Sequence, residues 1–248
     1  MIKVEEHDAG VRVVVLENGP VNVLDLELLR ELTATLSALR DAPAVVLTGA
    51  GRAFSAGVDL RRLLDGGKPY TADFLAALTA AFRAVFDHPR PVVAAVNGHA
   101  IAGGCVIAAA CDRRLMSAGT IGVTEILVGV PFPASALEAV RYVVGPATAG
   151  LVLSGTTLAP PDALAIGLVD EVVPPESLVD TAVARAATLA RVPAETFAVT
   201  KAQLRGAVSR QIADDDAANH DRLVDLWSCG PVRAAIGGYL DQLAARRR

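Results

Sequence analysis

The sequence is poor in cysteine, and the few cysteines that it has form no motif. Three occur in 248 residues, at Cys105, Cys111 and Cys229. Their spacing fits no zinc-binding pattern, and an odd number leaves one thiol outside any disulfide scheme. The sequence therefore predicts neither a metal site nor a disulfide framework, and we expect a reducing, cytoplasmic location.

The sequence also lacks a large net charge of either sign and has no long apolar segment. The formal net charge of −4 excludes the strongly basic surface of a nucleic-acid-binding domain, and the basic residues 246–248 are interpreted as a solvated helix end. The first ten residues mix charged with apolar side chains, unlike a signal peptide. No uninterrupted apolar run reaches the roughly 18 residues of a membrane span. We therefore expect neither nucleic acid nor a membrane as a partner.

Apolar residues are abundant, and they follow a regular order. They make up 52% of the sequence, against 20% for charged residues, which is enough for one large core. Short apolar runs typical of buried strands alternate with segments of helical spacing, such as Leu29, Leu32 and Leu36 after Asp25. The predicted strands are residues 2–6, 11–16, 44–49, 91–98 and 113–117, and the predicted helices between them include residues 71–87. This alternation predicts an α/β domain with parallel strand pairing over roughly residues 1–172.

Beyond residue 173 the pattern is helical only. The predicted helices are residues 194–205, 211–228 and 231–246. Gly206 and the "CGP" of residues 229–231 are expected to separate them. We therefore divide the chain into a catalytic core of residues 1–190 and a helical region of residues 191–248.

Two segments run from a predicted strand through glycines into a predicted helix, at residues 47–64 and 96–112. Gly103 and Gly104 fall near the first turn of the second helix, where each costs roughly 0.5–1 kcal/mol of helical stability relative to alanine. Neither segment matches a dinucleotide-binding fingerprint, because each lacks one of the glycines that this motif requires. Neither is a Walker loop, because no Gly-Lys-Ser/Thr sequence follows either turn. The glycines either permit tight bends or leave backbone N–H groups free to bind a negatively charged atom at a helix N-terminus.

Four stretches, taken together and in order, resemble the successive signatures of one enzyme family. They are "AFSAGVDL" (53–60), "VNGHAIAGGC" (96–105), "EILVGVP" (125–131) and "LVLSGTTLAPPDALAIGLVDEVVP" (151–174). The family is that of crotonase, the enoyl-CoA hydratases and isomerases. The resemblance implies a spiral α/β core of repeated ββα units, followed by helices that assemble homotrimers or dimers of trimers. It also implies an acyl-CoA substrate and no permanently bound cofactor, since coenzyme A arrives as part of the substrate.

The resemblance assigns roles to five residues of the two glycine-rich segments. In this family two backbone N–H groups form an oxyanion hole around the thioester carbonyl, and they match Val58 and Gly103. A glycine at position 103 would let the thioester oxygen approach without an intervening side chain. Losing one such donor typically costs ~2.7–4 kcal/mol of transition-state stabilisation. Ala56 would meet the adenine through its backbone, and Arg52 and Arg61 would lie near the phosphates, unless these arginines are ordinary surface charges.

A single carboxylate fills the catalytic positions of the family. Its hydratases hold a water molecule between two glutamates, whose positions correspond to residues 125 and 106 of this sequence. Residue 125 is a glutamate, but residue 106 is a valine, so the second acid is missing here. One carboxylate can instead take a proton from carbon 2 of an acyl thioester and return it to carbon 4, as in the 3,2-enoyl-CoA isomerase branch. We expect burial to raise the pKa of Glu125. Glu138 is expected to pair within a helix, and Asp59 to cap the next helix.

The leading hypothesis is therefore an isomerase of fatty-acid metabolism that converts 3-enoyl-CoA to 2-enoyl-CoA. Two alternatives stay open: a hydratase with a second acid from elsewhere, such as a neighbouring subunit, and a non-catalytic acyl-CoA-binding protein. From their place in the family, Leu64, Phe74 and Leu78 are expected to line the acyl pocket. His88 is expected at the surface, and Asn97 in a turn.

Overall fold

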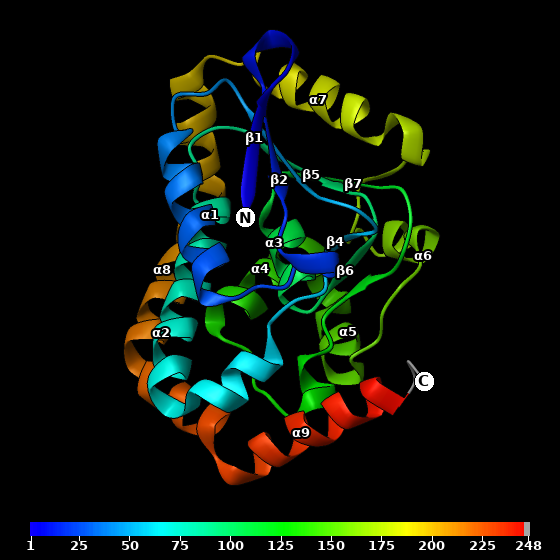
Figure 1. The fold of residues 1–248 in the computed structure, drawn as a ribbon. Coiled ribbons are helices and arrows are strands. Elements are labelled where there is room, and N and C mark those ends of the chain that lie inside the picture. Colours follow the sequence, from blue (N-terminus) through cyan, green and yellow to red (C-terminus); the bar gives the residue numbers. More distant parts are fainter. Residues whose placement is uncertain (246–248) are drawn as a thin grey trace.

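The computed structural model describes residues 1–245, which build two β-sheets connected by helices (Figure 1). The expected basic helix end at residues 246–248 lies outside the described residues. The larger sheet has the strand order β1 (Ile2–Glu6), β2 (Arg12–Leu16), β3 (Val45–Gly49), β5 (Val92–Val96), β7 (Arg113–Met116) and β9 (Glu171–Val172). The smaller sheet consists of β4 (Ala53–Ser55), β6 (His99–Ile101) and β8 (Ile121–Gly122). Neighbouring strands are parallel, except for the antiparallel hairpin of β1 and β2.

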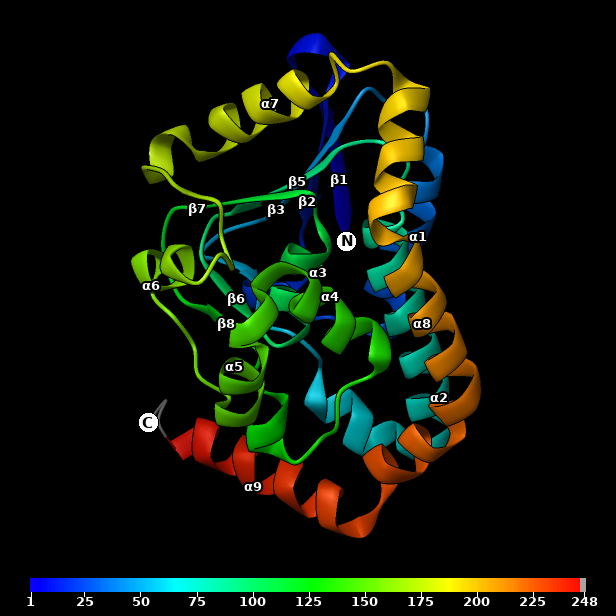
Figure 2. The ribbon, with the colours of Figure 1, turned by 180° about the vertical axis from the view of Figure 1, so that it is seen from behind.

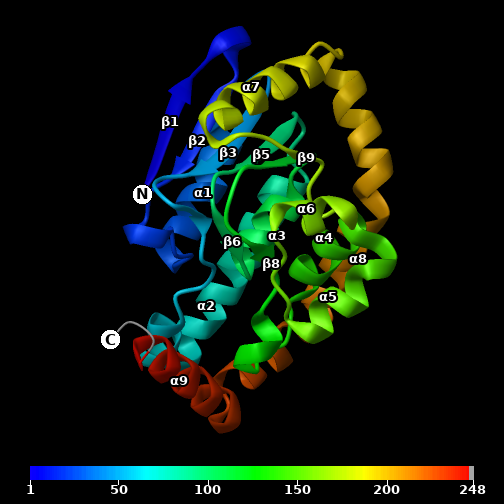
Figure 3. The same ribbon diagram turned by 90° about the vertical axis from the view of Figure 1, so that its right-hand side faces the viewer.

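The chain repeats one unit three times, two strands followed by a helix. β3 and β4 lead into α2 (Leu60–Phe86), β5 and β6 into α3 (Gly103–Ala110), and β7 and β8 into α4 (Ala134–Val144). In each unit the first strand joins the larger sheet and the second joins the smaller one, so that successive units stack as a spiral (Figure 3). β3 and β5 are buried along their whole length, as their continuous apolar sequence predicts.

The other helices cover this spiral. They are α1 (Leu26–Ala38), α5 (Thr148–Ser154), α6 (Pro160–Ala165), α7 (Leu178–Leu189), α8 (Ala194–Ser228) and α9 (Gly230–Ala245). Short 3₁₀ turns are η1 (Asp8–Gly10), η2 (Gly19–Val21), η3 (Glu125–Val128), η4 (Gly145–Ala147) and η5 (Pro175–Ser177). α1 begins after Asp25, whose carboxylate accepts a hydrogen bond from the Leu28 amide at 2.8 Å, a usual N-cap arrangement. α7 lies across one face of the larger sheet (Figure 2) and packs Ala182 and Ala186 on it.

Glycines allow the second repeat to lie directly on the first. A Cβ at Gly104 would stand 2.4 Å from the carbonyl oxygen of Ser55, and a Cβ at Gly98 would stand 2.0 Å from that of Arg52. Asn97 adds a side-chain link, because it accepts from the Gly49 amide at 3.1 Å and donates to the Gly51 carbonyl at 3.0 Å. The expected turn role of Asn97 is therefore confirmed.

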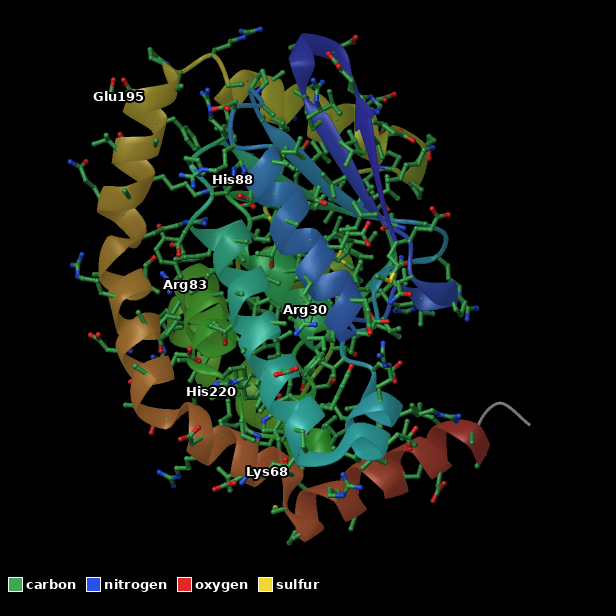
Figure 4. All side chains as sticks on the ribbon, turned by 60° about the vertical axis from the view of Figure 1, so that its left-hand side comes forward. Arg30, Lys68, Arg83, His88, Glu195 and His220 are labelled. Atoms are coloured by element: carbon green, nitrogen blue, oxygen red, sulfur yellow. The ribbon has the colours of Figure 1, made fainter. Side chains whose placement is uncertain are left out.

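Two sequence-based expectations about this part of the fold are wrong. α8 runs unbroken from Ala194 to Ser228, so Gly206 ends no helix. A single glycine costs only about 1 kcal/mol in a helix, which neighbouring packing offsets. His88 is not at the surface, since it is only 3% exposed. Its Nε2 lies 3.2 Å from the carbonyl oxygen of Leu36 on α1 (Figure 4), and burial lowers the pKa of its imidazole.

One helical stretch of the fold is apolar over an unusual length. Within the described residues, Ala134–Ser154, which joins α4 to α5 through η4, is long and apolar enough to cross a membrane by length and composition. In this fold 44% of its most apolar window is buried, and α4 packs against α3 and α8. Core helices of folded domains pass the same test, so the stretch is weak evidence for a membrane partner.

A buried group of charges fastens α8 to the spiral. Asp112, just after α3, accepts from Lys201 Nζ at 2.7 Å and lies 3.1 Å from Arg205. Arg205 also donates to the carbonyl oxygens of Phe86 and Ala110 at 2.7 and 2.9 Å. Burial lowers the pKa of Lys201. The carboxylate is the anionic partner of both cations, so the attachment of α8 depends on it.

We predict that Asp112→Asn destabilises the protein by about 3–5 kcal/mol, because the change leaves two buried cations without their anion. Urea unfolding at pH 7 measures this loss. Asp225→Asn is the matched control, since Asp225 pairs with Lys68 in an exposed ion pair at 2.5 Å, at the lower end of Figure 4. Water screens that pair. Equal unfolding midpoints for the two variants would contradict the role given to Asp112.

Candidate active site

The two glycine-rich turns predicted from the sequence lie against each other. Gly57 has a φ of +83°, and a Cβ there would stand 2.7 Å from the carbonyl oxygen of Ile101 and 3.4 Å from the Gly103 nitrogen. Ala102, at φ +51°, turns the chain so that α3 begins at Gly103. A side chain at position 57 would therefore push the two turns apart.

Each of these turns carries a free backbone N–H group. Leu24 bridges to both neighbours of Val58: its amide donates to Gly57 at 2.8 Å, and its carbonyl accepts from Asp59 at 3.0 Å. In a parallel bridge of this kind the amide of Val58 itself points away from Leu24. Gly103 opens α3, so its amide has no acceptor within the helix. Among residues 1–245 neither amide donates to a protein oxygen, which leaves two adjacent donors free for a ligand's carbonyl oxygen.

Glycine at position 103 also has a packing reason that the sequence did not indicate. A Cβ on Gly103 would lie 2.8 Å from Leu24 Cδ1 and 3.6 Å from Phe82 Cζ. Both side chains belong to the apolar core. The bare backbone at Gly103 thus lets α3 pack on Leu24, and the expectation that it clears a path for a substrate oxygen stays a prediction.

Glu125 is the buried acid of this region. It opens η3, separated from the end of β8 by Val123 and Thr124, and is 7% exposed. Burial raises the pKa of its carboxyl from the ordinary value of 4.5 to about 7, and backbone hydrogen bonds at Thr124 and Glu125 offset only part of that effect. Its Oε2 finds no hydrogen-bond partner among the described residues. An unpartnered buried carboxylate oxygen is unusual in a folded protein and marks Glu125 as a candidate functional group.

Two neighbouring hollows lie beside Val58 and Glu125. The outer groove, of about 670 Å³, is open and largely apolar. The inner pocket, of about 60 Å³, contains Glu125, the one carboxylate among the described residues that line it. The residues common to both are Ala56, Val58, Leu60, Ile101 and Tyr239. The two hollows therefore adjoin each other at the turn that carries Val58.

Most of the residues expected in the site are brought together. Ala56 and Val58 line both hollows, and Arg61 lines the outer groove. Gly103 is buried and lines neither hollow among residues 1–245, but its nitrogen adjoins the turn at Gly57. Arg52 is exposed and, in the chain from residue 1 to 245, lines neither hollow.

Asp59 and Glu138, the two other acids considered as candidates, have the structural roles expected of them. Asp59 caps α2, since its carboxylate accepts from the amides of Arg61 and Arg62 at 3.1 and 3.2 Å. Glu138 pairs with Arg141 on α4. Val106, at the position of the missing glutamate, is fully buried in the apolar core.

The lining of the pocket comes partly from helices that the sequence did not connect with it. Tyr239, Leu240 and Leu243 of α9 line the groove, and Trp227 of α8 lines the inner pocket. The apolar residues of α9 recur at helical spacing, and this pattern could have indicated that one face of the helix packs against the rest of the protein. Leu64, Phe74 and Leu78 line neither hollow in the described structure, and the last two are buried in the core.

Comparisons with known proteins agree with this arrangement. Residues 6–246 match the enoyl-CoA hydratase/isomerase family, so the chain belongs to that family of enzymes. Mitochondrial enoyl-CoA delta isomerase 1 of Homo sapiens is 30% identical over 243 residues, which cover 95% of this chain and 80% of that protein. The Rattus norvegicus enzyme of the same name is 30% identical over 251 residues, covering 98% and 87%.

Solved structures show the same likeness. The crystal structure of human mitochondrial delta3-delta2-enoyl-CoA isomerase superposes with a TM-score of 0.94 at 29% identity, covering 100% of this chain and 99% of that one. The enoyl-CoA hydratase EchA3 of Mycobacterium ulcerans gives a TM-score of 0.83 at 27% identity, covering 90% and 98%. The expected crotonase fold and the resemblance to the isomerase branch are thus confirmed.

The raised pKa of Glu125 predicts a particular pH dependence of stability. The pKa is about 7 in the folded protein and near 4.5 when unfolded, so between these values the folded state binds more protons. Stability therefore falls as pH rises through that window, by an amount on the order of 1–3 kcal/mol. Glu125→Gln abolishes the fall. We expect the free energy of unfolding of this variant, measured with urea, to exceed that of the parent by an amount that grows between pH 5 and pH 8.

The exposed Glu195 (Figure 4) provides the control, and Glu195→Gln should follow the parent at every pH. A pH-independent difference between Glu125→Gln and the parent would show that the carboxyl titrates as an ordinary exposed acid.

Proposed function

We propose that this enzyme moves the double bond of a 3-enoyl-CoA to the 2 position. One observation carries the proposal: the free Oε2 of Glu125 lies buried in a pocket that holds no other carboxylate among its described lining residues. The two free amides of Val58 and Gly103 lie on the adjoining turns. Acid–base chemistry next to a polarised carbonyl is what these groups are able to perform.

In the proposed reaction the amides of Val58 and Gly103 donate to the thioester oxygen. They stabilise the negative charge that develops there when a proton leaves carbon 2. Glu125 takes that proton and delivers it to carbon 4, while the double bond moves from carbons 3 and 4 to carbons 2 and 3. The substrate gains and loses one proton, so no water and no cofactor is consumed. A carboxyl with a pKa of about 7 suits both transfers near neutral pH.

Water addition is the competing function, and the pocket favours it less. A hydratase positions its water between two acids, whereas Val106 offers an apolar side chain that is fully buried. Hydration would need an acid from outside the described pocket, for example from a neighbouring subunit. A protein that only binds acyl-CoA would have no use for a buried carboxylate of raised pKa.

The outer groove is the place proposed for coenzyme A. Ala56 and Arg61 line it, and guanidinium groups bind phosphate well; Arg52 lies outside it and would reach only a phosphate beyond the groove. From the family to which the chain belongs we also propose a homotrimer or a dimer of trimers. The three free cysteines suit the proposed cytoplasmic location.

Replacing the carboxylate tests the chemistry. We expect Glu125→Gln to lower turnover of a 3-enoyl-CoA by about 100-fold or more, the usual contribution of acid–base catalysis. The amide keeps the size of the side chain, so the dissociation constant of a saturated acyl-CoA should stay within a few-fold of the parent value. Steady-state kinetics and calorimetry measure the two quantities. Turnover equal to that of the parent would remove Glu125 from the mechanism.

Separating the two turns tests the oxyanion hole. Gly57→Ala would place a Cβ 2.7 Å from the Ile101 carbonyl, whereas Gly51→Ala meets nothing within 4 Å at a similar φ of +71°. Both variants carry the strain of a positive φ, and only the first displaces the amides. We expect turnover to fall by about 100-fold or more in Gly57→Ala and only slightly in Gly51→Ala. Equal losses in the two folded variants would mean that backbone strain alone is responsible.

A further inference from the structure

Trp227 closes the inner pocket at the side of α8. It lines the pocket together with Glu125 and is only 4% exposed. Its indole N–H donates to the carbonyl oxygen of Pro131 at 2.9 Å. The ring also lies near that of Phe74, with the centroids 6.5 Å apart. Two contacts on different elements therefore hold the indole in place as a wall.

A separate cavity lies beyond this wall. It is open to solvent, has a volume of about 290 Å³ between the start of α4 and α8, and shares no described lining residue with the inner pocket. Its lining is apolar on the α4 side and charged at Asp215, Asp216 and Arg222 of α8. The neighbours of both hydrogen-bonded partners line it: Phe132 follows Pro131, and Leu226 precedes Trp227. His220, on the lower part of α8 in Figure 4, lines it too. The hydrogen bond between Trp227 and Pro131 thus stands between two hollows.

From this partition we infer that Trp227 limits the acyl chain, so that the substrates are short 3-enoyl-CoA thioesters. The inference rests on the proposed function for the position of the thioester at the amides of Val58 and Gly103. With carbons 2 and 4 beside Glu125, the chain from carbon 2 onward occupies the inner pocket of about 60 Å³. A cavity needs about 10–15 Å³ on this measure to hold one water molecule, and a methylene group is of similar size. The pocket therefore holds about four to six such groups, which suits acyl chains of about five to seven carbons.

Removing the indole should join the pocket to the cavity beyond it. In the parent we expect kcat/KM for 3-hexenoyl-CoA to exceed that for 3-dodecenoyl-CoA by about tenfold or more, since even one methylene that does not fit a pocket costs roughly that factor. In Trp227→Leu the ratio of the two values should shift toward the longer substrate by about tenfold or more. Leu226→Ala is the matched control, because its side chain lines only the far cavity and is 39% exposed. It should leave the ratio unchanged.

Trp227→Phe keeps an aromatic wall and loses the N–H group. We expect it to stay close to the parent in chain-length preference, which separates the bulk of the ring from its hydrogen bond. If Trp227→Leu does not fold, the preference of the parent together with that of Trp227→Phe decides the question. A parent enzyme that accepts both substrates equally overturns the inference, as does an unchanged ratio in a folded Trp227→Leu.

Binding measurements distinguish a failure of this inference from a failure of the proposed function. Calorimetry with hexanoyl-CoA and dodecanoyl-CoA requires no turnover. Tighter binding of hexanoyl-CoA by the parent, reversed or lost in Trp227→Leu, supports the chain-length limit even if no 3-enoyl-CoA is isomerised. Equal affinities for the two thioesters in the parent overturn the limit even if isomerisation is observed.

Discussion

The close approach of two backbone turns is the constraint on which the site depends. The turn at Gly57 lies so near Ile101 and Gly103 that a single Cβ would not fit between them. This approach requires the first two repeats of the spiral to stack tightly, which Gly98 and Gly104 permit by leaving room for the backbone of the preceding repeat. The free amides of Val58 and Gly103 lie near each other only because the turn at Gly57 packs so closely against residues 101–103.

Glu125 is a residue whose proposed function lowers the stability of the fold. Its buried, unpartnered carboxyl destabilises the folded state above neutral pH, as its raised pKa indicates. The fold compensates elsewhere, in the fully buried apolar strands β3 and β5 and in the buried contacts that Asp112 makes with α8. A carboxyl kept near pH 7 by burial gives the site a base that exchanges its proton readily.

The sequence predicts the parts of this fold that are locally regular. β3 and β5 follow from continuous apolar runs, and the cap at Asp25 follows from its side chain. The smaller sheet was missed because strands of two or three residues, such as β4 and β8, are too short to show a period. Glu125 stood out as a charge in an apolar stretch and through the family resemblance. Trp227 did not, because only the tertiary fold brings α8 to a pocket about a hundred residues away in sequence.

The central claim is that one buried carboxylate beside two amides moves a proton and does not add water. The most direct measurement compares two reactions of the same enzyme preparation under the same conditions. One is conversion of 3-hexenoyl-CoA to 2-hexenoyl-CoA, and the other is hydration of 2-hexenoyl-CoA to the 3-hydroxyacyl product. Faster isomerisation than hydration is the predicted result. Faster hydration would contradict the claim, because it would require a second acid that the described pocket does not contain.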